Sequence, residues 1–129
     1  MTESKYQSKI SKALLKEKGW LVNGIFTKDG ESDLQGGFPF KDSLFYIAIE
    51  VKTEKDYYRI MSGVKVIKED GIELYKIVDD KKLKEHESLQ IAKINLIRKR
   101  NGLGLIAWNY SQVKEYAEGV LNGRNISRE

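Results

Sequence analysis

A carboxylate and an ammonium group stand at the end of an apolar stretch of the chain. Glu50 and Lys52 follow the run 44–49, Leu-Phe-Tyr-Ile-Ala-Ile. In a strand they lie on the same face, about 6.6 Å apart. Charged groups at the end of a buried strand cost folding energy unless they are paired or used. With Asp33, an acid further upstream, Glu50 and Lys52 are expected to hold a hard cation and to stabilise an anion beside it.

The chemistry that suits these groups is phosphodiester hydrolysis. Two carboxylates 4 Å apart repel by roughly 4 kcal/mol at an effective dielectric constant of 20. A Mg²⁺ ion between Asp33 and Glu50 would remove that cost, and the backbone carbonyl of Val51 is a candidate third ligand. Such an ion makes a bound water easier to deprotonate and polarises a phosphoryl oxygen. Lys52 would orient the water or stabilise the developing anion.

Composition places these residues in one globular domain spanning 1–129. The chain is 40% hydrophobic and 33% charged, with no cysteine and a single histidine, His86. These values are typical of a soluble protein and exclude disulfides, a cysteine nucleophile and thiolate metal sites. No apolar run approaches the roughly 20 residues of a membrane helix, and no secretory signal is evident. We therefore expect a cytoplasmic protein with no membrane partner. The net charge of +4 allows a nucleic-acid partner without requiring one.

The first expected element is an amphipathic helix over residues 3–18. Its apolar stripe consists of Tyr6, Ile10, Ala13 and Leu14. A second stripe is basic and consists of Lys5, Lys9, Lys12 and Lys16, which share one face at about 100° per residue. This basic stripe is either a solvated surface or a row of nucleic-acid phosphate contacts.

Two strands are expected before the charged site. One covers residues 20–26. A second covers residues 32–35, and Gly36-Gly37 and Pro39, which follow, are expected to break it. The stretch 44–53 is apolar on both faces until Glu50, which predicts a central strand.

The second half predicts a hairpin, two helices and a strand. The expected elements are a hairpin turning at 69–71, a helix at 84–100, a strand at 103–108, a helix at 111–118 and a frayed tail at 119–129, whereas residues 54–62 are ambiguous, with a short helix as one interpretation. The helix 84–100 has an expected apolar stripe of Leu89, Ala92, Ile94, Leu96 and Ile97, with Gln90 inside it and Lys93 beside it. This order of elements predicts an α/β fold: a central mixed β-sheet flanked by helices, with a β-hairpin insertion.

These motifs carry a resemblance to a known superfamily. Asp33, followed after a hydrophobic strand by Ile49-Glu50-Val51-Lys52, resembles the core of the PD-(D/E)XK nucleases. A glycine before Ser32-Asp33-Leu34, and Gln90 on the next long helix, make the pattern most similar to the VRR-NUC branch, which is similar to Holliday junction resolvases. The resemblance covers most of residues 3–118.

The resemblance implies a restriction endonuclease-like fold and a Mg²⁺-dependent endonuclease, with Mn²⁺ as a substitute. It implies branched DNA, such as four-way junctions or flaps, as substrate, and a homodimer as the assembly. Asp33 and Glu50 would bind metal, Lys52 would be catalytic, and Gln90 would be a further active-site residue. Glu3, Gln7 and Lys93 are additional candidates for the site.

Three features depart from the family pattern. Ser32 replaces a proline that carries no chemistry. The usual glutamate of the first helix falls near Gln7 or Ser8, neither of which is acidic, and Glu3, one turn earlier, is a possible substitute. Residues 57–82 are longer than the compact pattern, so this segment has no assigned role.

Each residue of this motif, taken alone, also has a purely structural explanation. Glu50 and Lys52 could form a surface ion pair, Asp33 could belong to a turn, Gln90 could be a buried amide, and Lys93 could extend to solvent along the helix. Two other functions also remain open. One is a nucleic-acid-binding module on the same fold that is catalytically inactive, and the other is an interaction domain that uses the hairpin at 63–78.

Overall fold

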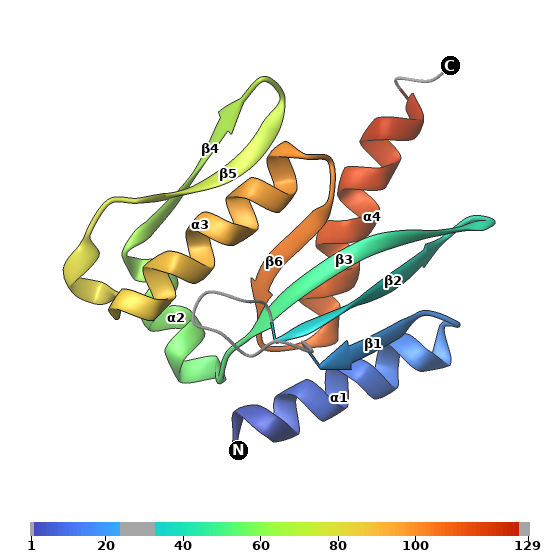
Figure 1. Cartoon of the computed structure of the whole chain (residues 1–129), viewed down its shortest axis with the longest axis horizontal. Helices are drawn as coiled ribbons and strands as arrows, with labels where there is room; N and C mark the ends of the chain where they lie inside the picture. The colour runs from blue at the N-terminus through green and yellow to red at the C-terminus, as the bar shows by residue number, and fades with distance from the viewer. Residues whose placement is uncertain (1, 24–32, 127–129) are drawn as a thin grey trace.

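A four-stranded mixed sheet with helices on both faces forms the centre of the protein (Figure 1). The computed structural model describes residues 2–23 and 33–126. In chain order the elements are α1 (Glu3–Lys16), β1 (Trp20–Asn23), β2 (Leu34–Phe40), β3 (Ser43–Val51), α2 (Glu54–Ser62), β4 (Val64–Glu69), β5 (Ile72–Ile77), a short 3₁₀ helix (Asp80–Lys82), α3 (Glu85–Lys99), β6 (Leu103–Ala107) and α4 (Tyr110–Ile126). The predicted α/β class, with its central mixed sheet and flanking helices, is confirmed.

The sheet has the strand order β1-β2-β3-β6. β1 and β2 pair antiparallel, as do β2 and β3, whereas β3 and β6 pair parallel. β3 therefore has a partner on each side, which confirms the central strand that its apolar sequence predicts. The carboxyl ends of β3 and β6 reach the same edge, with Val51 opposite Ala107.

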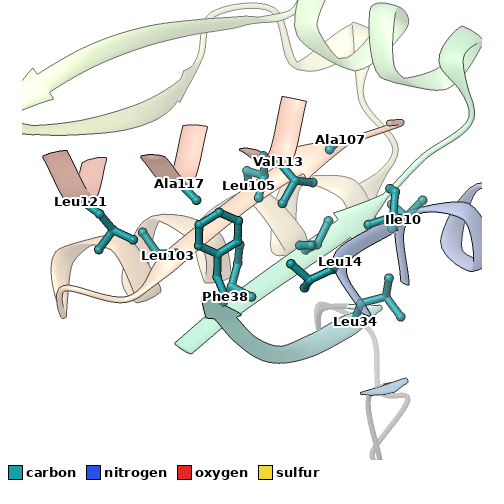
Figure 2. Close-up of a cluster of buried hydrophobic side chains, with 13 residues drawn as sticks. Ile10, Leu14, Leu34, Phe38, Leu103, Leu105, Ala107, Val113, Ala117 and Leu121 are labelled. Atoms are coloured by element: carbon teal, nitrogen blue, oxygen red, sulfur yellow. The ribbon is translucent and has the colours of Figure 1, made fainter. Parts of the chain in front are cut away.

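The main core lies between one face of this sheet and the helices α1 and α4 (Figure 2). Alternate residues of the strands point into it, as the two-residue period of a strand requires. Its buried members are Ile10 and Leu14 of α1, Leu34 and Phe38 of β2, Ile47, Ile49 and Val51 of β3, Leu103, Leu105 and Ala107 of β6, and Val113, Ala117 and Leu121 of α4. Ala48 and Glu50 of β3 lie on the opposite face of the sheet.

A second core lies on that other face, where α2, α3 and the β4–β5 hairpin meet β6. It contains Ile60, Tyr75, Ile91, Ile94 and Ile106. The predicted hairpin is confirmed and forms a separate two-stranded sheet. Residues 54–62, which are ambiguous in sequence, form the short helix α2. It starts after Thr53, whose side chain accepts a hydrogen bond from the Asp56 backbone N–H.

Arg98 ties the hairpin to the second core. Its guanidinium lies 4.5 Å from the ring centroids of both Tyr75 and Tyr116 and donates to the carbonyls of Gly104 and Glu73. Arg98 belongs to a run of basic residues at the end of a helix, and such residues are usually exposed. Arg98 is nevertheless only 6% exposed. Its partners are rings and carbonyls, so it stabilises the packing of several elements.

Pro39 and the glycine pair 36–37 do not break β2, so that prediction is wrong. β2 runs through all three residues. A Cβ on Gly36 would approach the Trp20 carbonyl oxygen to 1.9 Å, so glycine permits the close pairing with β1. β1 pairs only as far as Gly37, which leaves Pro39 where β2 has a free edge, and a strand tolerates proline there.

The predicted apolar stripe of α3 is wrong in part. Leu89 and Leu96 are about half exposed, at 50% and 48%, and Ala92 is exposed as well. The buried side runs instead through Ile91, Ile94 and Arg98. The helix packs its Ile91 side between β6 and the hairpin, because Ile106 and Tyr75 provide the second core there.

The predicted frayed tail is also wrong for residues 119–126. α4 continues to Ile126, and Leu121 is only 2% exposed. Val113, Ala117 and Leu121 follow a four-residue spacing, so one stripe keeps the helix on the sheet.

Residues 127–129, residues 24–26 of the predicted first strand, and Ser32 lie outside the described residues. Within the described ranges, no helix is both long and apolar enough to cross a membrane.

Candidate functional site

The charged residues predicted from sequence gather at the carboxyl end of the central strand. Glu50 is the second-last residue of β3 and Lys52 follows its end, and they are only 1% and 5% exposed. The Lys52 backbone N–H donates to the carbonyl of Ala107 at 3.0 Å, which holds this end of β3 against β6. Because both charged residues are buried at a strand end, a surface ion pair is excluded as the explanation.

Glu50 is held by two side chains from different directions. Gln90 of α3 donates from Nε2 to Glu50 Oε1 at 2.7 Å. Lys52 Nζ lies 3.7 Å from the same oxygen. Glu50 Oε2 and Gln90 Oε1 are buried and have no hydrogen-bond partner in the described part of the chain. Each such atom costs free energy, so a ligand that reached the free carboxylate oxygen would satisfy it.

Asp33 is fixed beside this group by the backbone. Its Oδ2 accepts a hydrogen bond from the Val51 N–H at 3.0 Å, and its side chain is half-buried. Asp33 directly precedes β2, and this hydrogen bond anchors its side chain to the end of β3. The expected meeting of Asp33 and Glu50 is supported by their electrostatic coupling.

That coupling appears in the pKa of Glu50, which is raised to about 9. Burial is the largest cause, followed by the negative charge of the nearby Asp33, whereas the positive charge of Lys52 opposes the shift. Glu50 therefore keeps its proton at neutral pH in the metal-free protein. A divalent cation bound to the carboxylate would displace that proton.

Glu3 belongs to the same electrostatic group. Burial raises the pKa of Glu3, and Asp33 raises it further, whereas Lys52 lowers it. Glu3 in turn contributes to the raised pKa of Glu50. The first turn of α1 thus faces the site. This supports Glu3 as the substitute for the first-helix glutamate that the resemblance places one turn later, near Gln7.

The remaining predicted residues lie around this centre without direct contacts to it. Gln7 is half-buried on α1, and Lys93 is exposed on α3; among the described residues neither makes a hydrogen bond or ion pair with Asp33, Glu50 or Lys52. The lysines of the basic stripe, Lys5, Lys9, Lys12 and Lys16, are all exposed on α1. Their exposure fits a solvated face and a phosphate-binding row equally well.

Two groups near the site are absent from the sequence-based prediction. Arg59 of α2 donates to both oxygens of Glu87 at 2.8 and 2.7 Å and so joins α2 to the start of α3. The second group is Trp108 and its aromatic neighbours. The position of Trp108 is readable from sequence, because it ends the predicted strand 103–108, but its neighbours come from distant segments.

The site fits a hard divalent cation through its donor set. Asp33 and Glu50 supply two carboxylates, and one oxygen of Glu50 has no described partner. Across residues 2–23 and 33–126, no group of three or more histidine, cysteine, aspartate or glutamate side chains is placed to enclose a metal. Two carboxylates with the remaining positions open is the pattern that Mg²⁺ uses when water and phosphate complete its shell.

Comparison of the chain with family models, with curated proteins and with solved structures gives no match.

Proposed function

We propose that this protein is a Mg²⁺-dependent, structure-selective DNA endonuclease with a restriction endonuclease-like fold of the VRR-NUC type in the PD-(D/E)XK superfamily. One observation carries the proposal. A buried carboxylate, Glu50, lies near the end of the central strand with Gln90 at 2.7 Å and Lys52 at 3.7 Å, beside a second carboxylate, Asp33, that the strand itself anchors. The four residues of the sequence motif are thus neighbours in space.

Each residue has a role that its surroundings support. Asp33 and Glu50 would hold Mg²⁺, with Mn²⁺ as a substitute and the Val51 carbonyl as an additional ligand. When bound, the ion would activate water and neutralise charge on the phosphate. Lys52 places a positive charge next to Glu50 and would stabilise the negative charge that develops in the transition state. Gln90 is a positioning residue, because its hydrogen bond fixes one oxygen of Glu50.

Branched DNA is the proposed partner, in four-way junctions or flaps. The exposed basic stripe on α1 would contact backbone phosphates, which carry much of the affinity in protein–DNA complexes. The proposal includes a homodimer, since a twofold pair places two sites for two strands.

A second candidate function is an inactive nucleic-acid-binding module on the same fold. The absence of a third acidic ligand among the described residues favours it. The buried and partly unsatisfied Glu50 weighs against it, because a module without catalysis has no need to bury a carboxyl group with an unpartnered oxygen.

The test is cleavage of labelled DNA. Purified protein is incubated with a four-way junction, a flap and a matched linear duplex, each with Mg²⁺, Mn²⁺ or EDTA. The proposal predicts metal-dependent nicks in the branched substrates and none in EDTA. Binding of branched DNA without any product in either metal would establish the inactive module instead.

A further inference from the structure

An aromatic cluster borders the charged site. It is defined by Tyr6 of α1, Tyr58 of α2 and Trp108, which follows β6. The Trp108 ring packs edge-on against Tyr6, with centroids 6.2 Å apart and an interplanar angle of 86°. It also meets Tyr58 at 6.5 Å and 55°. Three elements that are distant in sequence therefore bring their rings together in one cluster.

The backbone places this cluster next to Lys52. The Lys52 N–H donates to the Ala107 carbonyl, so Lys52 and Trp108 leave the sheet as neighbours. Helix α2, which carries Tyr58, begins two residues after Lys52. Tyr6 lies one helical turn after Glu3, which is electrostatically coupled to Lys52 and Asp33. In Figure 1 the start of α1, the helix α2 and the ends of β3 and β6 gather at the same edge of the molecule.

Within the cluster, Tyr58 presents surface that neither core uses, whereas Tyr6 packs against the main core. Tyr58 is 58% exposed, whereas its neighbour Tyr57 packs against the second core. The Trp108 indole Nε1 is buried with no hydrogen-bond partner among the described residues. An exposed ring and a donor without a described partner, both beside the proposed phosphate-hydrolysing centre, suit a planar group that carries hydrogen-bond acceptors.

We propose that the aromatic cluster stacks an unpaired nucleobase next to the phosphate that is cut, an inference that rests on the nuclease function proposed above. Aromatic side chains accept any base by its face, and the contact is independent of sequence. A base inside a duplex is already stacked on its neighbours and cannot reach Tyr58. The substrate would therefore carry a single-stranded segment at the cleavage point, as a flap or an opened junction does.

The experiment measures binding, so that it stands apart from catalysis. Trp20 and Trp108 are the tryptophans of the chain, and a Trp20→Phe background makes the emission report on Trp108 alone. A single-stranded oligonucleotide and a duplex of the same sequence are titrated in EDTA. The inference predicts quenching by the single strand and little change with the duplex. Equal quenching by both, or none by either, would overturn it.

Variants of Tyr58 identify the contact. Tyr58→Ala should weaken binding of the single strand by about tenfold, in the range expected for one stacked base, whereas Tyr58→Phe keeps the ring and should bind as the parent does. Tyr46→Ala removes a similarly exposed ring from β3, at 50% exposure, and should have no effect. If Tyr58→Ala does not fold, Tyr58→Leu keeps an apolar side chain without an aromatic face. Unchanged affinity in whichever variant folds would refute the stacking role.

The experiments can contradict the nuclease proposal and the stacking proposal independently of each other. Stacking by Trp108 and Tyr58 in a protein that cuts no DNA would remove the nuclease and keep a single-strand-binding site. Cleavage of branched DNA with equal rates in the parent and in Tyr58→Ala, and no preference for single-stranded ligand, would remove the stacking site and keep the nuclease.

Discussion

Gln90 and Glu50, forty residues apart in sequence, are joined by a 2.7 Å hydrogen bond across the site. The bond links the end of the central strand to α3, whose buried side packs on β6 and the hairpin. Gln90 donates through its amide nitrogen and leaves its oxygen without a described partner. This bond fixes the orientation of Glu50 from the helix side, while Lys52 approaches the same oxygen from the end of the strand.

Glu50→Gln should remove a pH dependence of stability in the metal-free protein. The pKa of Glu50 is about 9 in the folded state and near its ordinary value when unfolded. Between these values the unfolded state loses a proton that the folded state keeps, so stability falls as pH rises, by up to about 1.4 kcal/mol per pH unit. The glutamine variant lacks this loss and should be more stable than the parent at pH 8.

Urea unfolding in EDTA at pH 5 and pH 8 measures this effect. The control is Glu115→Gln, which changes an exposed glutamate of α4 and should track the parent at both values. If Glu50→Gln also tracked the parent at both values, Glu50 would be ionised in the folded protein and its pKa would not be raised.

Asp33→Asn should abolish stabilisation by metal while the fold persists. Asparagine can still accept the Val51 N–H through its oxygen. Removal of the Asp33 charge also removes one cause of the raised pKa of Glu50, and so part of the cost of holding Glu50 protonated at neutral pH, so metal-free stability should hold or rise. For the parent, Mg²⁺ at 100 times its dissociation constant adds about 2.7 kcal/mol. In a domain of this size that corresponds to roughly ten degrees in melting temperature.

Melting scans with Mg²⁺, Mn²⁺ and EDTA, with and without a non-cleavable DNA, measure the shift. Asp42→Asn, in the exposed turn before β3, is the matched control and should shift as the parent does. An equal shift in Asp33→Asn would show that Asp33 is not a ligand, and it would favour the inactive module.

The basic stripe is tested by salt dependence. Replacing Lys5, Lys9, Lys12 and Lys16 with glutamine should reduce the slope of log affinity against log salt by about 0.9 for each phosphate that the protein no longer neutralises. The control replaces Lys65, Lys68, Lys76 and Lys81, which are also exposed, and keeps the net charge equal between the two variants. Equal slopes in the two variants would make the α1 stripe an ordinary solvated surface.

Much of this arrangement can be predicted because single segments carry enough information. The apolar run 44–49 on both strand faces predicts a central strand, and Glu50 and Lys52 at its end predict charged groups at a sheet edge. The hairpin follows from the turn at 69–71. In each case local pattern and final structure agree.

The errors arise where tertiary contacts decide. Which side of α3 is buried depends on Tyr75 and Ile106, which lie outside the helix, so its periodicity alone assigns Leu89 and Leu96 wrongly. Pro39 remains in a strand because β1 is too short to reach it. The aromatic cluster escapes prediction because its three rings converge only after α1 and α2 pack at one edge of the sheet.

Lys52→Ala tests the central claim most directly, since Lys52 is placed to act on charge that exists only during the reaction. Single-turnover cleavage of a labelled branched substrate is measured in Mg²⁺, together with affinity for the same DNA in EDTA. Lys76→Ala, which removes an exposed lysine of the hairpin, is the matched control. We expect Lys52→Ala to lower the cleavage rate by at least about 100-fold with nearly unchanged affinity, whereas Lys76→Ala should cleave as the parent does. Cleavage by Lys52→Ala at the parent rate would contradict the assignment of this site as the catalytic centre.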